Sequence, residues 1–448
     1  SVCDSIMTSI SKSFSEKETP LFIERFTAEI EDALYNKSDR CILPTLATVP
    51  RGQEKGRFLA IDVGGSTLRI GAIELLGHSE YSLYGSWSWH IGNGLKTING
   101  EFFEMIADCI LEVVTVNARG FFGDVCDGNV IAGLSWSFPI TQTDVRNAFV
   151  TVVSKGFQLS DDIFGRDIVP ILTRTLVVKH GLRMDIRAVT NDAVTVFIAA
   201  RYMFNSSIGL VLGTGINASF LLKDTIVNSE LSFFGSHLCN LASSEIDLKM
   251  FEGYHEVSYP LHMSLKFPLV QPLEYMSSGR YLGEMFRIGL RSMIESEELF
   301  CGQLVPETLS APYQISGEDM CNIYEFSYED SRNLVDSKLN LSMSESDYNT
   351  ISSFIDVLIS RAANLVASSL ISCFNVIKRN SDSQSHTESG SQEQVTIGYV
   401  GSLLEKFYCY RTKLEETLEK CHILYDTPRF KLVHIDNSTL VGAAIAAA

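Results

Sequence analysis

The first residues able to do chemistry lie in a glycine-rich turn between two strand-like segments. Residues 58–63 are an apolar run of strand length, and residues 68–72 alternate between aliphatic side chains and Arg69 or Gly71, the period of a second strand. The turn between them reads Gly64-Gly65-Ser66-Thr67. Glycines allow positive φ and leave the backbone open to a ligand, so this turn predicts a phosphate-binding loop.

Two charged side chains flank this turn. Asp62 is the one acid in the first apolar strand and stands at its C-terminal end, where a carboxylate can reach Mg²⁺ or a water beside bound phosphates. Arg69, on the next strand, can neutralise phosphate charge. A Gly-Gly turn also occurs in ordinary β-hairpins, so the turn alone leaves both readings open.

A second loop of the same kind favours the phosphate reading. Residues 208–212 form a buried-type strand, Gly213-Thr214-Gly215 follows it, and a further strand resumes just after Asn217. The chain thus contains two units in which a Gly-hydroxyl-Gly turn joins two strands. This pair resembles the paired phosphate loops of the actin, heat-shock-protein-70 and sugar-kinase superfold. That resemblance implies that ATP lies between two related domains.

Composition narrows the class of partner. The chain has 448 residues, 45% of them hydrophobic, and a net charge of -18 without a Lys/Arg run, so we expect neither nucleic acid nor an anionic membrane as its main partner. Its ten cysteines are scattered without a Cys-x-x-Cys pair, which predicts reduced thiols in the cytoplasm and no zinc site. No apolar run reaches the ~18 residues of a membrane helix. Monomer and homodimer both stay open.

The elements that must position these loops can be read from periodicity. Helices are predicted over residues 1 to about 40, 101–116, 192 to about 202, 351–377, 401–421 and 440–448, and further strands over 130–134, 395–400 and 430–435. Residues 303–345 are polar and weakly patterned. The Ser/Gln/Glu-rich segment 380–394 predicts a mobile surface loop.

Several motifs together resemble the eukaryotic hexokinases, from about residue 42 to the C-terminus. They begin with Leu43-Pro-Thr45, Glu54-Lys-Gly56 and Leu59-Ala-Ile-Asp-Val-Gly-Gly-Ser66. Ser135-Trp-Ser-Phe-Pro139 is similar to the family's Phe-Ser-Phe-Pro sugar loop, and Ser154-Lys155-Gly-Phe157 to its Thr-Lys-Gly-Phe. Asn228-Ser-Glu230-Leu-Ser-Phe-Phe-Gly235 is similar to Asn-Thr-Glu-Trp-Gly-x-Phe-Gly.

The resemblance implies a set of sugar-binding residues. They are Ser137, Phe138, Ser154, Lys155, Asn191, Asp192, Asn217, Glu230 and Glu274. Asp192 would be the general base, and Lys155 and Arg69 would offset developing charge. By spacing alone, Asn191-Asp192 is a helix cap and the two glutamates are surface acids, so only the resemblance assigns them these roles.

The resemblance also implies where the nucleotide binds. MgATP would be held by Gly64, Gly65, Ser66, Thr67, Gly213, Thr214, Gly215, Gly401 and Ser402, with Asp62 orienting Mg²⁺ through water. The implied fold is α/β, the two-lobed ribonuclease-H-like (actin-like ATPase) hexokinase fold. Its small lobe would be residues 57–191 with 437–448, its large lobe residues 192–436 with 1–56, and its active site the interlobe cleft.

Several positions depart from glucose-type hexokinases. Leu231 replaces the usual Trp, Ala193 the usual Thr, and Val400 an acid, and residues 436–441 lack the usual Gly-Ser-Gly-Lys. The overall pattern resembles the fungal N-acetylglucosamine kinases, a branch of the family, which implies ATP-dependent phosphorylation of N-acetyl-D-glucosamine at the 6-hydroxyl. The smaller Leu231 is expected to leave room for the 2-acetamido group. A glucose or mannose hexokinase is the first alternative, and a hexokinase-like sugar sensor with little catalysis is the second.

Overall fold

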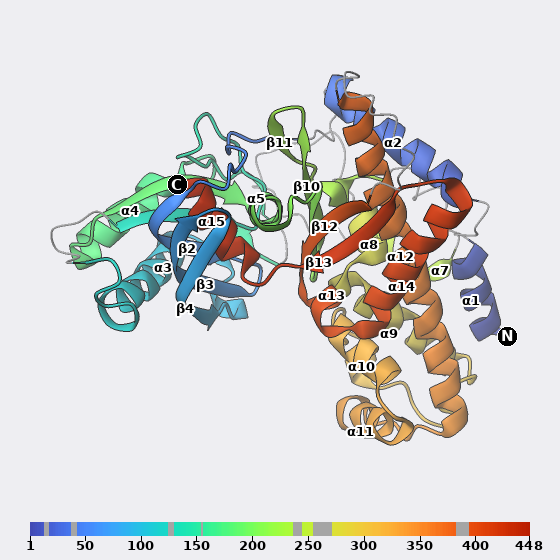
Figure 1. The fold of residues 1–448 in the computed structure, drawn as a ribbon. Coiled ribbons are helices and arrows are strands. Elements are labelled where there is room, and N and C mark those ends of the chain that lie inside the picture. The colour runs from blue at the N-terminus through green and yellow to red at the C-terminus, as the bar shows by residue number, and fades with distance from the viewer. Residues whose placement is uncertain are drawn as a thin grey trace.

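The computed structural model describes residues 1–12, 18–36, 43–123, 130–153, 156–235, 244–253, 271–381 and 394–448. Within these residues the chain forms two bodies, each built on a β-sheet flanked by helices (Figure 1). The predicted mobile loop, apart from residues 380, 381 and 394 at its ends, lies outside the described residues, as do Ser154 and Lys155.

A five-stranded sheet in the order β4-β3-β2-β6-β8 forms the first body. Its strands are β2 (Lys55–Val63), β3 (Thr67–Gly77), β4 (Glu80–His90), β6 (Val130–Trp136) and β8 (Met184–Asn191). β2, β6 and β8 run parallel, with Asp62 paired to Ser135 and Ser135 paired to Thr190. The carboxyl ends of these three strands therefore lie level at one edge of the sheet, the edge where ligands bind in open α/β sheets.

Helices cover both faces of this sheet. α3 (Gly100–Glu112), a π-helical turn η2 (Val113–Asn117) and α4 (Ile168–His180) pack on one face, and α15 (Ser438–Ala447) packs on the other. The side chains of β2 alternate between the two faces of the sheet. Leu59 and Ile61 face the first group of helices, and Phe58 and Ala60 face α15. Beside this sheet lie η1 (Asn93–Leu95) and the parallel pair β5 (Thr97–Ile98) and β7 (Gln158–Leu159).

A six-stranded sheet in the order β1-β11-β10-β9-β12-β13 forms the second body. Its strands are β1 (Leu43–Pro44), β9 (Ile208–Leu212), β10 (Ile216–Leu222), β11 (Thr225–Asn228), β12 (Gln394–Val400) and β13 (Arg429–His434). β9, β12 and β13 run parallel, and the other neighbours are antiparallel. The second glycine-rich loop joins β9 to β10, just as the first joins β2 to β3.

Most helices belong to this second body (Figure 1). They are α1 (Val2–Lys12), α2 (Thr19–Asn36), η3 (Leu231–Phe233), α7 (Glu245–Gly253), α8 (Pro272–Ser277), α9 (Gly279–Glu295), η4 (Glu307–Leu309), α10 (Gly317–Glu325), α11 (Tyr328–Leu339), α12 (Glu345–Asn380), α13 (Ser402–Lys406) and α14 (Tyr408–Tyr425). α10 and α11 occupy the region that is weakly patterned in sequence. The single helix predicted over 401–421 is instead two helices, because Phe407 adopts an extended backbone and buries its ring.

The 36-residue helix α12 is the central helix of the second body. Among the described helices it is the one long and apolar enough to cross a membrane, but 83% of its most apolar window is buried inside the protein. Arg361 on α12 forms two 2.8 Å hydrogen bonds with Asp247 of α7 in the core. Burial against other elements thus explains why the helix is apolar.

The two bodies meet where α5 (Asp192–Phe204) packs against α15. Both helices share one hydrophobic cluster with Phe58 of the first sheet and Ile226 of the second. The contact depends on Gly442, because a Cβ at that position would lie 1.9 Å from the carbonyl oxygen of Thr195. The positions of the two sheets are therefore coupled through a close backbone contact.

We expect Gly442→Ala to lower the free energy of unfolding by about 1 to 3 kcal/mol, because the added methyl group must push α15 away from α5. Urea unfolding and Tm measure the change. Gly100→Ala is the matched control, since a Cβ there meets no atom within 4 Å. A Gly442→Ala protein as stable as the control would show that the two helices do not need this close contact.

Candidate active site

The first glycine-rich turn closes the hairpin between β2 and β3. The Gly64 N–H donates to the Thr67 carbonyl at 3.0 Å, and a Cβ on Gly64 would lie 2.9 Å from the same oxygen. Ser66 is exposed at the tip. The tight backbone geometry at Gly64 thus holds the turn in a shape that leaves residues 64–67 open to a ligand.

The second loop packs against the segment expected to hold the nucleotide. Within it, the Gly213 N–H donates to the Gly215 carbonyl at 3.0 Å. A Cβ on Gly213 would lie 3.2 Å from the Ser402 nitrogen, and a Cβ on Gly401 would lie 2.3 Å from the Leu212 carbonyl oxygen. Glycines at these positions let the loop and the start of α13 approach closely.

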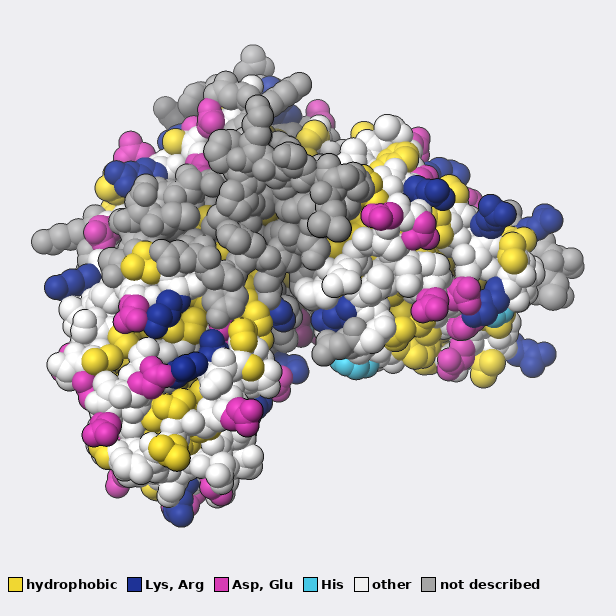
Figure 2. Space-filling model, turned by 180° about the vertical axis from the view of Figure 1, so that it is seen from behind, with side chains coloured by type: hydrophobic (Ala, Val, Ile, Leu, Met, Phe, Trp, Pro, Cys, Tyr) yellow, Lys and Arg dark blue, Asp and Glu magenta, His cyan; other side chains and the backbone are white. Residues whose placement is uncertain are grey.

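Both loops line one cavity of about 520 Å³ between the two sheets. Figure 2 shows the molecule notched between its two bodies. Seventeen of the predicted site residues line this cavity: Asp62, Gly64, Gly65, Ser66, Thr67, Arg69, Ser137, Asn191, Asp192, Gly213, Thr214, Gly215, Asn217, Glu230, Glu274, Gly401 and Ser402. Their individual roles remain predictions, but the structure brings them together.

Phe138 was expected to bind the sugar, but it is not a lining residue of the cavity. Its ring is fully buried and packs at 4.9 Å from the Phe157 ring and 5.8 Å from the Trp136 ring, so it supports the Ser137 turn from the core. Leu231 is also fully buried and is not a lining residue of the cavity. The lining residues next to it in the chain are Ser232 and Phe233, and the expectation that the smaller Leu231 leaves room for the 2-acetamido group stays a prediction.

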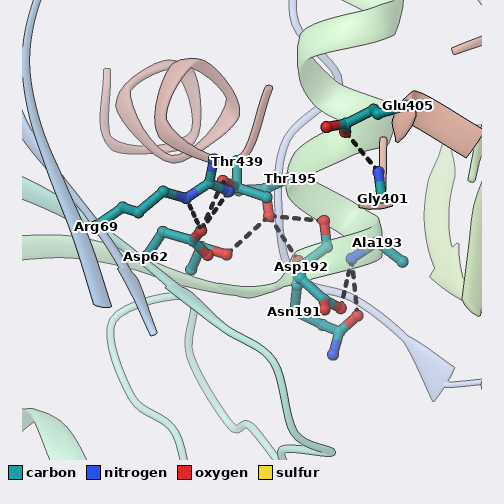
Figure 3. A network of polar contacts seen from close by, with 10 residues as sticks. Asp62, Arg69, Asn191, Asp192, Ala193, Thr195, Gly401, Glu405 and Thr439 are labelled. Atoms are coloured by element: carbon teal, nitrogen blue, oxygen red, sulfur yellow. Dashed lines mark hydrogen bonds and ion pairs between the residues drawn. The ribbon is translucent and has the colours of Figure 1, made fainter. Parts of the chain in front are cut away.

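Asp62, Arg69 and Thr439 form a cluster of polar contacts in the site (Figure 3). Arg69 donates to Asp62 Oδ2 from Nε at 3.1 Å and from Nη2 at 2.8 Å. Thr439 Oγ1 donates to the same oxygen at 2.8 Å and accepts from Arg69 Nη2 at 2.8 Å. The charge of Asp62 raises the pKa of Arg69, which keeps the guanidinium protonated.

Asn191 and Asp192 begin α5 at the carboxyl end of β8. Asn191 caps the helix, with Oδ1 accepting from the Ala193 N–H at 3.0 Å, and Asp192 Oδ1 accepts from the same N–H at 2.8 Å. Thr195 Oγ1 bonds to the carbonyls of both residues. Asp192 is 7% exposed and lines the cavity from a helix N-terminus, where negative charge is stabilised.

A chain of amides and carboxylates forms the other end of the cavity. Asn217 Nδ2 donates to Asn191 Oδ1 at 3.3 Å and to Asn228 Oδ1 at 2.9 Å, and Asn228 Nδ2 donates to Glu230 Oε1 at 2.7 Å. Glu274 Oε2 accepts from the Ile216 N–H at 3.0 Å. This end therefore presents fixed acceptors and amide groups, which suit a polyhydroxylated ligand.

The residues also fit a magnesium-bound nucleotide. Asp62 Oδ1 is buried and, within the described ranges, has no hydrogen-bond partner. Those ranges contain no group of three or more His, Cys, Asp or Glu side chains able to hold a metal alone. A cation here would take its ligands from phosphate and water, with Asp62 orienting it through water.

Sequence reasoning missed several lining residues. Thr439 and Glu405 belong to the predicted nucleotide end, where Glu405 Oε1 accepts from the Gly401 N–H at 2.7 Å (Figure 3). Gln271 and Ser232 belong to the sugar end. The position of Thr439 just after the last strand was a usable signal, since the carboxyl edge of a parallel sheet collects ligand-binding groups.

Known proteins match the whole chain. Two hexokinase family models match residues 9–202 and 207–448. N-acetylglucosamine kinase 1 of Candida albicans is 31% identical over 100% of this chain and 94% of its own length. Hexokinase-1 of Nicotiana tabacum is 26% identical, over 91% of this chain and 82% of its own length.

A solved structure confirms the predicted fold. Hexokinase from Schistosoma mansoni complexed with glucose superimposes with a TM-score of 0.83 at 22% identity, covering 99% of this chain and 98% of that one. These matches confirm the predicted two-lobed actin-like ATPase fold. They also confirm the resemblance to hexokinases, with a fungal N-acetylglucosamine kinase among the matched relatives. On the family models and on these similarities, this chain belongs to the hexokinase family.

Proposed function

We propose that this protein transfers the γ-phosphoryl group of ATP to the 6-hydroxyl of N-acetyl-D-glucosamine, giving N-acetylglucosamine 6-phosphate and ADP. One observation carries the proposal: a single cavity is lined both by two glycine-rich loops and by the buried carboxylate of Asp192. The 31% identity to the Candida albicans enzyme supports the amino sugar as the acceptor.

Phosphoryl transfer depends mainly on positioning and on neutralising charge, because its transition state is loose and anionic. The backbone of residues 64–67 and of residues 213–215, which line the cavity, would hold the phosphates. Arg69, which lines the cavity and is fixed by Asp62, would offset their charge. When bound, Mg²⁺ would neutralise phosphate charge, and Asp62 would orient it through water.

The acceptor would be held by the amides and carboxylates at the other end of the cavity. Asn191, Asn217, Glu230 and Glu274 all line it. Asp192 would accept the proton of the 6-hydroxyl as the oxygen bonds to phosphorus. Because the cavity lies between two bodies, their closure on the sugar would exclude water from the transfer.

The function is tested by a coupled assay of ADP formation with MgATP. We expect kcat/KM to be highest for N-acetylglucosamine among N-acetylglucosamine, glucose, mannose and glucosamine. A higher value for glucose or mannose would replace the proposal with that of a general hexokinase, and no turnover with any of the four would favour the sugar sensor.

We expect Asp192→Asn to lower kcat about 10²- to 10⁴-fold, because the amide keeps the shape of the side chain but cannot accept the hydroxyl proton. Sugar affinity, measured by calorimetry, should change far less. A variant that retained kcat would exclude Asp192 as the base. Asp224→Asn, an exposed acid in the β10–β11 turn, is the matched control.

We expect Thr439→Val to lower kcat/KM about 10- to 100-fold, the ~1.5 to 3 kcal/mol of a hydrogen bond to a charged group, because Asp62 and Arg69 lose a shared partner. Thr439→Ser retains the hydroxyl and should restore most of the rate. Equal losses in the two variants would mean that the methyl group, through packing, accounts for the effect.

A further inference from the structure

The sugar end of the cavity contains a buried amide that the proposed mechanism does not use. Gln271 precedes α8, lines the cavity and is 4% exposed. Its Nε2 donates to Ser232 Oγ at 3.3 Å, whereas its Oε1 is buried without a hydrogen-bond partner among the described residues. A buried acceptor of this kind is costly unless a ligand supplies the missing donor.

Ser232 completes a polar pair with Gln271. Its side chain is buried, lines the same cavity and accepts the Gln271 hydrogen bond at Oγ. A hydroxyl that accepts a hydrogen bond keeps its own hydrogen for donation. The pair therefore offers the cavity one acceptor, Gln271 Oε1, and one donor, Ser232 Oγ–H.

Phe233 adds an apolar surface beside this pair. It follows Ser232 in η3, is half-buried and lines the cavity. An N–H donor, a carbonyl acceptor and a methyl group are the three features of an acetamido substituent. The wall thus presents a complement for each of them.

Three neighbouring polar residues, Glu230, Glu274 and Asn217, do not supply the donor to an acetamido carbonyl. When ionised, the carboxylates of Glu230 and Glu274 accept hydrogen bonds but donate none. The side-chain amide of Asn217 already donates to Asn191 and Asn228. Ser232 is moreover a departure of this chain, since the hexokinase pattern has glycine at that position.

We propose that Gln271, Ser232 and Phe233 form the subsite for the 2-acetamido group of the sugar, with Gln271 Oε1 accepting its N–H, Ser232 donating to its carbonyl and Phe233 packing on its methyl group. This inference rests on the proposed N-acetylglucosamine kinase function. It places amino-sugar specificity on polar groups rather than on the room left by Leu231.

The test compares kcat/KM for N-acetylglucosamine with kcat/KM for 2-deoxyglucose, which has the same 6-hydroxyl and no substituent at C2. We expect the ratio of the two values to fall at least tenfold in Gln271→Leu and about three- to tenfold in Ser232→Ala, because each variant leaves an acetamido polar atom unpaired. The matched control is Gln53→Leu, an exposed amide that does not line the cavity, which should keep the wild-type ratio.

Each outcome decides the inference. A ratio that stays within twofold of wild type while both values fall equally would overturn the subsite and leave the proposed function standing. A wild-type enzyme that does not phosphorylate N-acetylglucosamine would overturn both. If Gln271→Leu does not fold, Ser232→Ala, a smaller truncation, decides by the same ratio, supported by calorimetric affinities for the two sugars.

Discussion

The buried carboxylate of Asp62 is the contact on which the phosphate end of the site depends. It holds Arg69 from the neighbouring strand and Thr439 from the last helix, so both strands of one hairpin and a helix 377 residues further along the chain meet at one oxygen. A buried carboxylate loses its hydration and must be compensated by donors, which Arg69 and Thr439 supply. The same contact fixes the guanidinium at the cavity wall. The charge that stabilises the local structure is thus also the charge available to an anionic ligand.

The location of the cavity follows from sheet topology. Parallel strands β2, β6 and β8 end level with one another, and their last residues or the turns beyond them provide Asp62, Ser137 and Asn191. The second sheet brings its glycine-rich loop and the start of α13 to the other side. Because α5 carries Asp192 and packs on Gly442 of α15, the position of the carboxylate depends on the same helix contact that joins the two bodies.

The resemblance to hexokinases predicted the fold and most of the site residues that line the cavity, and local patterns alone predicted the two glycine-rich loops. A turn such as Gly64–Thr67 is visible in sequence because its backbone geometry demands particular residues at adjacent positions. Thr439 and Gln271 were missed because a threonine or glutamine is polar in any setting, and only the tertiary structure shows that it is buried against a partner. The prediction that Phe138 contacts the sugar failed for the opposite reason: a motif fixes the position of a residue along the chain but not the direction of its side chain. Ser154 and Lys155 lie outside the described residues, so their predicted roles stay predictions.

A pocket can distinguish sugars either by the room it leaves, as proposed for Leu231, or by polar groups that need a partner, as proposed for the Gln271–Ser232 pair. Extra room for one or two carbon atoms distinguishes substrates by only ~10- to 200-fold, since a smaller sugar still fits. A buried acceptor that needs a donor acts differently, because every ligand lacking that donor leaves Gln271 Oε1 unpaired. Gln271 Oε1 therefore disfavours a sugar without a donor at C2, such as 2-deoxyglucose, whereas the 2-hydroxyl of glucose or mannose can still donate to it, so Ser232 and Phe233 must distinguish the amide from the hydroxyl. Within the hexokinase fold, a glycine-to-serine change in one short helix is a small alteration that can move specificity from a hydroxyl toward an amide.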